Sequence, residues 1–258
     1  MSSILSEIKN HVLFVTLNRP EKFNSFNREM ALQLIDVLNK AEKNKEVRAI
    51  VLTGNGKAFC AGQDLAEAVD PNGPGIEKIV VEHYNPIIMK IRSVEKPVIA
   101  AVNGVAAGAG ANFALACDIV YAAQSAGFIQ AFSKIGLIPD SGGTFTLPRL
   151  IGFQLASALM ITGDKLSAEE ALKFGLVYKV FEDADMLSQV TLSAEKIAAM
   201  PTKAIGLTKL LLNASATNTL EQQLQLEKEI QVQSAATYDY QEGVNAFLEK
   251  RKPDFKGE

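Results

Sequence analysis

The most telling part of the chain reads Val98-Ile99-Ala100-Ala101-Val102-Asn103-Gly104-Val105-Ala106-Ala107-Gly108-Ala109-Gly110. Its first five residues are apolar and include three β-branched side chains, which is typical of a buried strand. A glycine-rich turn follows, and we expect a helix to begin after Gly108. The next apolar run, Ile119-Val120-Tyr121, predicts another strand. This succession of strand, helix and strand favours an α/β fold.

The same alternation extends along the chain in both directions. Val12 to Leu17 and Val47 to Thr53 predict buried strands, and Ile76 to Arg92 predicts a helix. Asn27 can cap an earlier helix, because its side chain can accept from the first free N–H groups. That helix would bury apolar residues at helical spacing, namely Met30, Leu34, Leu38 and Ala41. Ser167 to Glu170 matches a capping box and predicts another helix start.

The C-terminal quarter has a different character, because strand patterns stop near residue 195. The segments that predict helices there are Lys196–Ser215, Leu220–Ser234 and Tyr240–Lys250. Pro201 should interrupt the first of them. We therefore divide the chain into an α/β body, residues 1–195, and a helical region, residues 196–258.

Composition excludes several classes of protein. The chain has 258 residues, a hydrophobic content of 48% and a formal net charge of -3. The mean hydropathy is +0.10, and no apolar run reaches the roughly 20 residues of a spanning helix. The acidic balance argues against nucleic-acid binding. Two cysteines and two histidines give no disulfide framework and no metal-ligand spacing. We expect a cytoplasmic protein without a metal or a membrane anchor.

Three turns carry the candidate chemistry. Phe59 to Asp64 and Asn103 to Gly110 can present backbone N–H groups, and Gly136 to Thr144 contains the acidic residue Asp140. One carboxylate facing two N–H donors suits proton transfer beside a thioester carbonyl group. A structural alternative exists for each turn. The first two can be plain strand-to-helix connections, and Asp140 can be a helix cap in a Pro-Asp-Ser-Gly turn.

Taken together, these motifs resemble the enoyl-CoA hydratase/isomerase (crotonase) superfamily, in the same order and over nearly the whole chain. The matching segments are Asn18-Arg19-Pro20, Phe59 to Asp64, Asn103 to Gly110, Cys117-Asp118-Ile119, Pro139 to Thr144 and Phe247 to Arg251. The resemblance implies a spiral of strand-strand-helix units followed by helices used for trimerisation. It also implies an acyl-CoA substrate, no separate cofactor, and a homo-oligomer that is a trimer or a dimer of trimers.

The resemblance also implies which residues act. The backbone N–H groups of Gln63 and Ala109 would form an oxyanion hole for the thioester oxygen. The residues that would contact the CoA part or the rest of the substrate are Lys22, Ala61, Asp64, Phe247 and Lys250. Phe247 and Lys250 match a C-terminal pair that reaches the CoA, in some members that of a neighbouring subunit.

The expected reaction follows from where this chain departs from the hydratases it resembles. Hydratases carry two glutamates, and here those positions hold Asn112 and Phe132, neither of which can serve as a base. Asp140 replaces a glycine of hydratases and is expected to be the catalytic residue, as in the isomerases of the family. The implied reaction is conversion of 3-enoyl-CoA to 2-enoyl-CoA, or of ring-1,2-epoxyphenylacetyl-CoA to oxepin-CoA, or both.

Other functions remain open at this stage. The chain can be a hydratase of the same family, or a non-catalytic crotonase-fold protein that binds RNA. A dehalogenase of the family uses an Asp at the position of Asp140, but it also needs a Trp and a His nearby. This chain has no Trp, and Met89 stands where that His would match.

Overall fold

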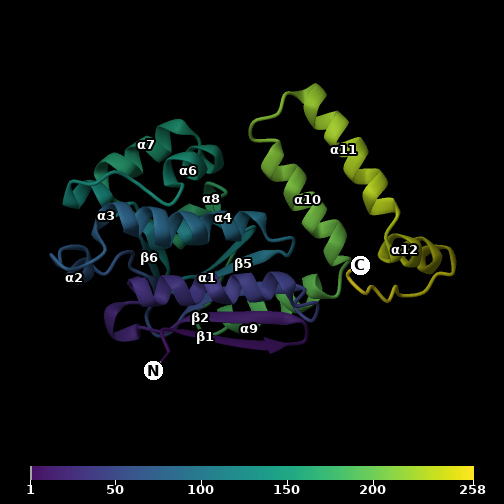
Figure 1. Cartoon of the computed structure of the whole chain (residues 1–258), viewed down its shortest axis with the longest axis horizontal. Coiled ribbons are helices and arrows are strands. Elements are labelled where there is room, and N and C mark those ends of the chain that lie inside the picture. The colour runs from purple at the N-terminus through teal and green to yellow at the C-terminus, as the bar shows by residue number, and fades with distance from the viewer. Residues whose placement is uncertain (1) are drawn as a thin grey trace.

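The computed structural model describes residues 2–258 (Figure 1). It opens with a hairpin whose two turn residues, Asn10 and His11, both have positive φ, at 48° and 64°. Such a turn matches the twist of the strands it joins. The hairpin strands are β1 (Ile4–Lys9) and β2 (Val12–Leu17), and helix α1 (Arg28–Lys43) follows. As predicted, the Asn27 side chain accepts from the Met30 N–H at 3.0 Å and caps α1.

Two sheets form the body, and the chain visits them in turn. The larger sheet has the strand order β1-β2-β3-β5-β7-β10, and all pairs after the hairpin are parallel. Its later strands are β3 (Ala49–Gly54), β5 (Val98–Val102), β7 (Ile119–Ala123) and β10 (Lys179–Phe181). The smaller sheet has the order β4-β6-β8-β9. Its strands are β4 (Ala58–Cys60), β6 (Val105–Ala107), β8 (Gly127–Ile129) and β9 (Lys165–Ser167).

From β3 to β8, each turn of the chain therefore contributes one strand to each sheet and then a helical segment. After β3 and β4 come the helices α2 (Leu65–Ala68), α3 (Gly75–Lys78), a π-helical segment (Ile79–Tyr84) and α4 (Asn85–Ser93). After β5 and β6 comes α5 (Ala109–Ala116). After β7 and β8 come a 3-10 turn (Ala131–Ile135), α6 (Gly143–Ile151) and α7 (Phe153–Thr162). The expected spiral of strand-strand-helix units is confirmed.

Two helices complete the body. The predicted capping box is present: the Ser167 hydroxyl accepts from the Glu170 N–H, and the Glu170 carboxylate accepts from the Ser167 N–H. It begins α8 (Ala168–Lys173). Helix α9 (Met186–Ala198) packs on β3, β5 and β7. The boundary drawn at residue 195 thus falls inside α9, because this helix belongs to the body and ends only before Pro201.

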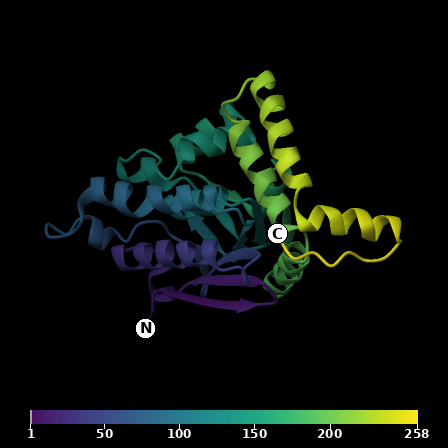
Figure 2. The same cartoon turned by 45° about the vertical axis from the view of Figure 1, so that its right-hand side comes forward.

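The last three helices project from the body, as both views show (Figures 1 and 2). They are α10 (Thr202–Ala214), α11 (Leu220–Ala235) and α12 (Tyr238–Leu248). Lys209 on α10 docks this part on the body: its ammonium group lies 2.7 Å from the Asp118 carboxylate. Among residues 2–258, no helix combines the length and the apolarity that crossing a bilayer requires.

Candidate active site

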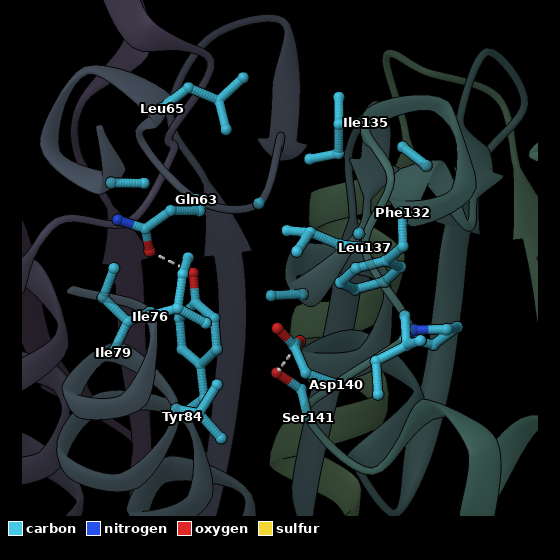
Figure 3. A pocket seen from close by; sticks show the side chains of 18 of the residues that line it. Gln63, Leu65, Ile76, Ile79, Tyr84, Phe132, Ile135, Leu137, Asp140 and Ser141 are labelled. Atoms are coloured by element: carbon cyan, nitrogen blue, oxygen red, sulfur yellow. Dashed lines mark hydrogen bonds between the residues drawn. The ribbon is translucent and has the colours of Figure 1, made fainter.

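A cavity of about 540 Å³ lies where the three predicted turns meet (Figure 3). One wall comes from the turn after β4 and from the helices around residues 76–85. The opposite wall comes from residues 131–142, which connect β8 to α6. Most of the lining side chains are apolar, including Leu65, Ile76, Ile79, Ile135, Leu137 and Ile138. A cavity of this kind suits an apolar acyl group.

Two glycines let the first two turns touch. Gly62 has φ +92°, and a Cβ there would lie 3.0 Å from the Ala107 carbonyl oxygen and 3.6 Å from the Ala109 nitrogen. A Cβ on Gly110 would lie 2.7 Å from the Cys60 sulfur. Larger residues at either position would push the turns apart. Their close contact brings the main chain at Gln63 and Ala109 to the same side of the cavity, and both residues line it.

The N–H groups of Gln63 and Ala109 are free to bind a ligand. Gln63 forms a parallel bridge with Phe26 through its neighbours, because Gly62 accepts from and Asp64 donates to Phe26. The Gln63 N–H therefore points to the other side of the strand. Ala109 is the first residue of α5, where an N–H has no partner within the helix. Within residues 2–258 neither N–H has a protein acceptor. The α5 dipole adds positive potential at Ala109.

Asp140 lies across the cavity from these donors and is the one carboxylate among its lining residues. The Ser141 hydroxyl donates to its carboxylate at 2.9 Å. Burial raises the pKa of Asp140, and this hydrogen bond opposes the rise. The side chain does not cap α6, because that helix begins at Gly143 with Gly142 as its N-cap and without a side-chain cap. The alternative interpretation of Asp140, a helix cap, is therefore wrong.

Tyr84, which no sequence pattern singled out, lines the cavity opposite Asp140 (Figure 3). Its hydroxyl donates to Gln63 Oε1, and the Gln63 amide donates in turn to Glu67 at 3.1 Å. This holds the Gln63 side chain at both ends. Burial raises the pKa of Tyr84, so the hydroxyl remains a donor. The π-helical segment that carries Tyr84 has no simple sequence signal, although such segments are frequent at functional sites.

The two positions that hold glutamates in hydratases carry no acid here. Phe132 lines the cavity beside the turn before α5, with its ring 3.7 Å from where a Cβ on Gly108 would lie. Asn112 is 2% exposed and lies behind the wall. The cavity thus has apolar surface where a hydratase would need its second acid.

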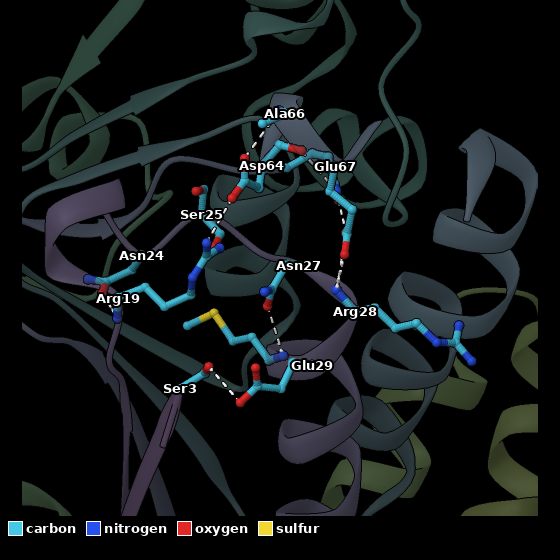
Figure 4. Close-up of polar contacts among 12 residues, drawn as sticks. Ser3, Arg19, Asn24, Ser25, Asn27, Arg28, Glu29, Asp64, Ala66 and Glu67 are labelled. Carbon is cyan, nitrogen blue, oxygen red and sulfur yellow. Dashed lines mark hydrogen bonds and ion pairs between the residues drawn. The ribbon is translucent and has the colours of Figure 1, made fainter. Parts of the chain in front are cut away.

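Only one of the first three expected substrate-binding residues lines the cavity. Ala61 lines the cavity. Asp64 instead pairs with Arg19 at 2.8 Å and caps α2 through the Ala66 N–H (Figure 4). Burial alone would raise the pKa of Asp64, but the bond to Arg19 and its charge outweigh burial and lower it. Lys22 is exposed on a 3-10 turn near Arg19. Asp64 and Lys22 do not line the cavity.

Phe247 belongs to α12 and Lys250 follows it, and Figure 1 shows α12 at the opposite side of the molecule from α2 and α3. Phe247 is 82% exposed, and Lys250 has a φ of 56° just after α12. Neither lines the cavity.

Known proteins share this architecture over their full length. The family model described as enoyl-CoA hydratase/isomerase matches residues 7–258. The chain is 48% identical to the 1,2-epoxyphenylacetyl-CoA isomerase of Escherichia coli K12, covering 100% of this chain and 99% of that protein. It is 44% identical to a protein of Rhodobacter capsulatus named "Probable enoyl-CoA hydratase", over 99% and 98%.

A solved structure gives the same picture of the fold. The enoyl-CoA hydratase of Bacillus anthracis superimposes with a TM-score of 0.93 at 36% identity, covering 99% of this chain and 100% of the other. The match of the family model and the identities of the relatives extend through both the body and the projecting helices. The chain belongs to the enoyl-CoA hydratase/isomerase family.

Proposed function

We propose that this protein is an acyl-CoA isomerase in which Asp140 moves a proton along the acyl group. One observation carries the proposal: Asp140 is the single carboxylate that lines the cavity, opposite the free N–H groups of Gln63 and Ala109. One carboxylate is enough for an isomerisation, because the proton is returned to the same molecule. Addition of water needs both a base for the water and an acid for the carbon.

The proposed reaction begins at the thioester. The oxygen of 3-enoyl-CoA accepts from the N–H groups of Gln63 and Ala109, which makes the C2 protons more acidic. Asp140 removes one C2 proton, and the negative charge moves onto the oxygen of a dienolate, where the two donors and the α5 dipole stabilise it. The protonated Asp140 then returns the proton at C4, which leaves the double bond between C2 and C3. Burial of Asp140 raises its pKa and so favours both roles.

A ring epoxide of phenylacetyl-CoA is the second proposed substrate. Its thioester would use the same two donors, and the apolar walls around Phe132 and Leu137 would receive the ring. Support comes from the E. coli relative at 48% identity, whose name states this isomerase activity. We also propose that Lys22, Ala61 and Asp64 lie near the CoA part. Phe247 and Lys250 would reach the CoA of a neighbouring subunit in a trimer or a dimer of trimers.

Hydration is the second candidate function, because other relatives are named as hydratases. The lining residues argue against it, since the cavity offers no second carboxylate. The test is incubation of the purified protein with 3-hexenoyl-CoA, 1,2-epoxyphenylacetyl-CoA and 2-hexenoyl-CoA, with products identified by mass and ultraviolet spectrum. Isomerised products of the first two with their mass unchanged support the proposal. A gain of one water molecule by 2-hexenoyl-CoA at a comparable rate would favour a hydratase. If none of the three assays gives a product and the protein shifts RNA in a gel, the non-catalytic RNA-binding alternative would be favoured.

A further inference from the structure

Two buried amide side chains form a chain of hydrogen bonds that ends on the main chain of Asp140. Gln130 Nε2 donates to Asn112 Oδ1 at 2.9 Å, and Asn112 Nδ2 donates to the Asp140 carbonyl oxygen at 2.8 Å. Gln130 and Asn112 are 4% and 2% exposed. Neither lines the cavity. Asn112 therefore contacts the Asp140 segment from behind, Gln130 contacts Asn112, and neither reaches a substrate in the cavity.

The chemistry of the Asp140 peptide fixes the direction of this chain of amides. A carbonyl oxygen can only accept, so Asn112 must turn its NH2 group toward Asp140. Asn112 Oδ1 then faces Gln130, which must present its own NH2 group. That orientation leaves Gln130 Oε1 buried and without a hydrogen-bond partner among residues 2–258.

The segment after Asp140 also rests on Asn112. A Cβ on Gly143 would lie 2.8 Å from Asn112 Cγ, so only glycine fits against the amide. The Gly143 N–H donates to the same Asp140 carbonyl oxygen at 2.9 Å. The Asp140 peptide is therefore held by Asn112 on one side and by the start of α6 on the other. Because the carboxylate is only two bonds from this main chain, the position of the peptide determines where the carboxylate lies.

We infer that Asn112, with Gln130 behind it, is a positioning residue for the Asp140 carboxylate. The inference rests on the proposed function of Asp140. Position 112 would thus have a different task from the one it has in the hydratases that the chain resembles. An ionised carboxylate at this place would face the Asp140 carbonyl oxygen and repel it, so it could not hold the Asp140 segment as Asn112 does.

The variant Asn112→Asp tests the inference, because it is isosteric and its effect depends on pH. When ionised, the new carboxylate faces the Asp140 carbonyl oxygen and cannot donate to it. When protonated, it can donate and restore the bond. The pH profile of the variant therefore reports whether this bond matters for the reaction.

Other titratable side chains on the elements around Asn112 should not disturb this profile. Burial raises the pKa of Tyr84 and of Cys60, that of Cys60 to about 12, so neither changes charge in the range used. The basic side chains of the neighbouring helices α4 and α6 have partners elsewhere: Lys90 pairs with Glu42, Arg92 pairs with Asp118, and Arg149 donates to the Phe145 carbonyl oxygen.

We expect the wild type to lose activity only as pH falls through the pKa of Asp140. Asn112→Asp should also lose activity as pH rises, which gives a bell-shaped profile of kcat between about pH 5 and pH 9. At pH 8 its kcat should be roughly 10 to 10² lower, since a displacement of about 1 Å can have such an effect. KM should change by less than about threefold, because Asn112 does not touch the substrate.

A matched control separates positioning from general loss of stability. Asn24 is also buried, at 0% exposed, and its amide donates to the carbonyl oxygens of Asn55 and Ala58 at 2.9 and 2.8 Å. Asn24→Asp should lower the melting temperature but leave the shape of the pH profile unchanged. If Asn112→Asp does not fold, Gln130→Met serves instead. It frees Asn112 to rotate and should lower kcat several-fold without raising KM.

The outcomes distinguish this inference from the proposed function. If Asp140→Asn is inactive while a folded Asn112→Asp keeps the wild-type kcat and pH profile, the positioning role is wrong and the function stands. The same conclusion follows if Gln130→Met, used in its place, keeps the wild-type kcat. If Asp140→Asn keeps full turnover, both are wrong. A bell-shaped profile for Asn112→Asp with unchanged KM and a normal control supports the positioning role.

Discussion

The hydroxyl of Ser141 donates a 2.9 Å hydrogen bond to the carboxylate of Asp140 inside a largely apolar cavity. This bond and burial act on the pKa of Asp140 in opposite directions, and burial has the larger effect. The result is a carboxylate that is more basic than one in water. Its neighbour on the chain therefore tunes the group that we propose to carry the proton.

Asp140→Asn should remove the base while keeping the shape of the side chain. We expect the isomerisation rate to fall roughly 10²- to 10⁴-fold, which is the usual contribution of a positioned general base. Rates with 3-hexenoyl-CoA and affinity for a non-reactive acyl-CoA would be measured in parallel. Loss of rate with intact binding is the expected pattern, and near-normal turnover would rule out the catalytic role.

The same variant should not lower stability at neutral pH. Burial raises the folded-state pKa of Asp140 above its unfolded value. The group thus favours the folded state at low pH and loses that contribution as pH rises through the folded pKa. Replacing an ionised buried carboxylate with a neutral amide should therefore leave the denaturation midpoint at pH 7 unchanged or higher. A drop of about 1 kcal/mol would instead indicate a lost helix cap.

Ser141→Ala should shift the pH dependence of the reaction. The hydroxyl lowers the pKa of Asp140, so its removal should raise that pKa further. Because Asp140 must be ionised to accept a proton, kcat/KM should begin to fall at a higher pH than in the wild type. At pH values above this fall, the kcat/KM values of the wild type and of Ser141→Ala should converge. An acid limb at an unchanged or lower pH would contradict the assigned hydrogen bond.

Ala109 should act through its N–H and not through its methyl group. Ala109→Gly keeps the donor and should retain most activity. Ala109→Pro removes the donor and should lower kcat about 10²- to 10³-fold, as loss of one oxyanion donor does. Proline is tolerated at the first position of a helix, and circular dichroism would check that the variant folds. A folded Ala109→Pro protein with normal turnover would show that Ala109 donates nothing to the reaction.

Two lysines on α10 should differ in their contribution to stability. Lys209 is buried against Asp118 and also donates to the Ile91 carbonyl oxygen at 2.6 Å. Lys203 pairs with Glu95 at the surface. Lys209→Met should lower the free energy of unfolding by about 3 kcal/mol, because it removes the closest cation from a partly buried carboxylate that keeps only Arg92 as a charged partner. Lys203→Met should cost at most about 1 kcal/mol. Equal effects in urea unfolding would contradict this assignment.

Hydration of 2-enoyl-CoA should be much slower than isomerisation of 3-enoyl-CoA. Asn112 and Phe132 provide neither of the two acids that hydration needs. The ratio of the two rates, measured on acyl groups of equal length, tests this directly. Comparable rates would mean that Asp140 and a water molecule suffice for hydration in this cavity.

The longest periodic segments were the predictable part of the fold. The strands Val12–Leu17 and Val98–Val102 appear with the predicted bounds, and Asn27 caps α1. The strands of the smaller sheet have only three residues each, which is too short for any periodicity to show. Their pairing depends on contacts between turns of the spiral that are distant in sequence.

The candidate site, too, was predictable from the sequence only in part. Gln63, Ala109 and Asp140 lie on turns that carry the resemblance to the family, which implied their roles, and the structure brings them to one cavity. Tyr84 was missed because its position depends on a π-helical segment, in which side chains turn by a different angle per residue. The contacts of Phe247 and Lys250 stay a prediction, because they depend on a second copy of the chain.

The strand order β1-β2-β3-β5-β7-β10 follows the order of the sequence without exception. Each new strand is therefore added at the edge that the preceding one has just left open, and no strand must be inserted between two others. A chain that leaves the ribosome N-terminus first can therefore form this sheet one strand at a time, in the order of synthesis. The two turns that carry Gln63 and Ala109 would be complete once α5 has emerged, whereas the Asp140 segment is added later. During synthesis, the pocket that we propose to bind the thioester oxygen is thus assembled before the carboxylate that we propose to move the proton.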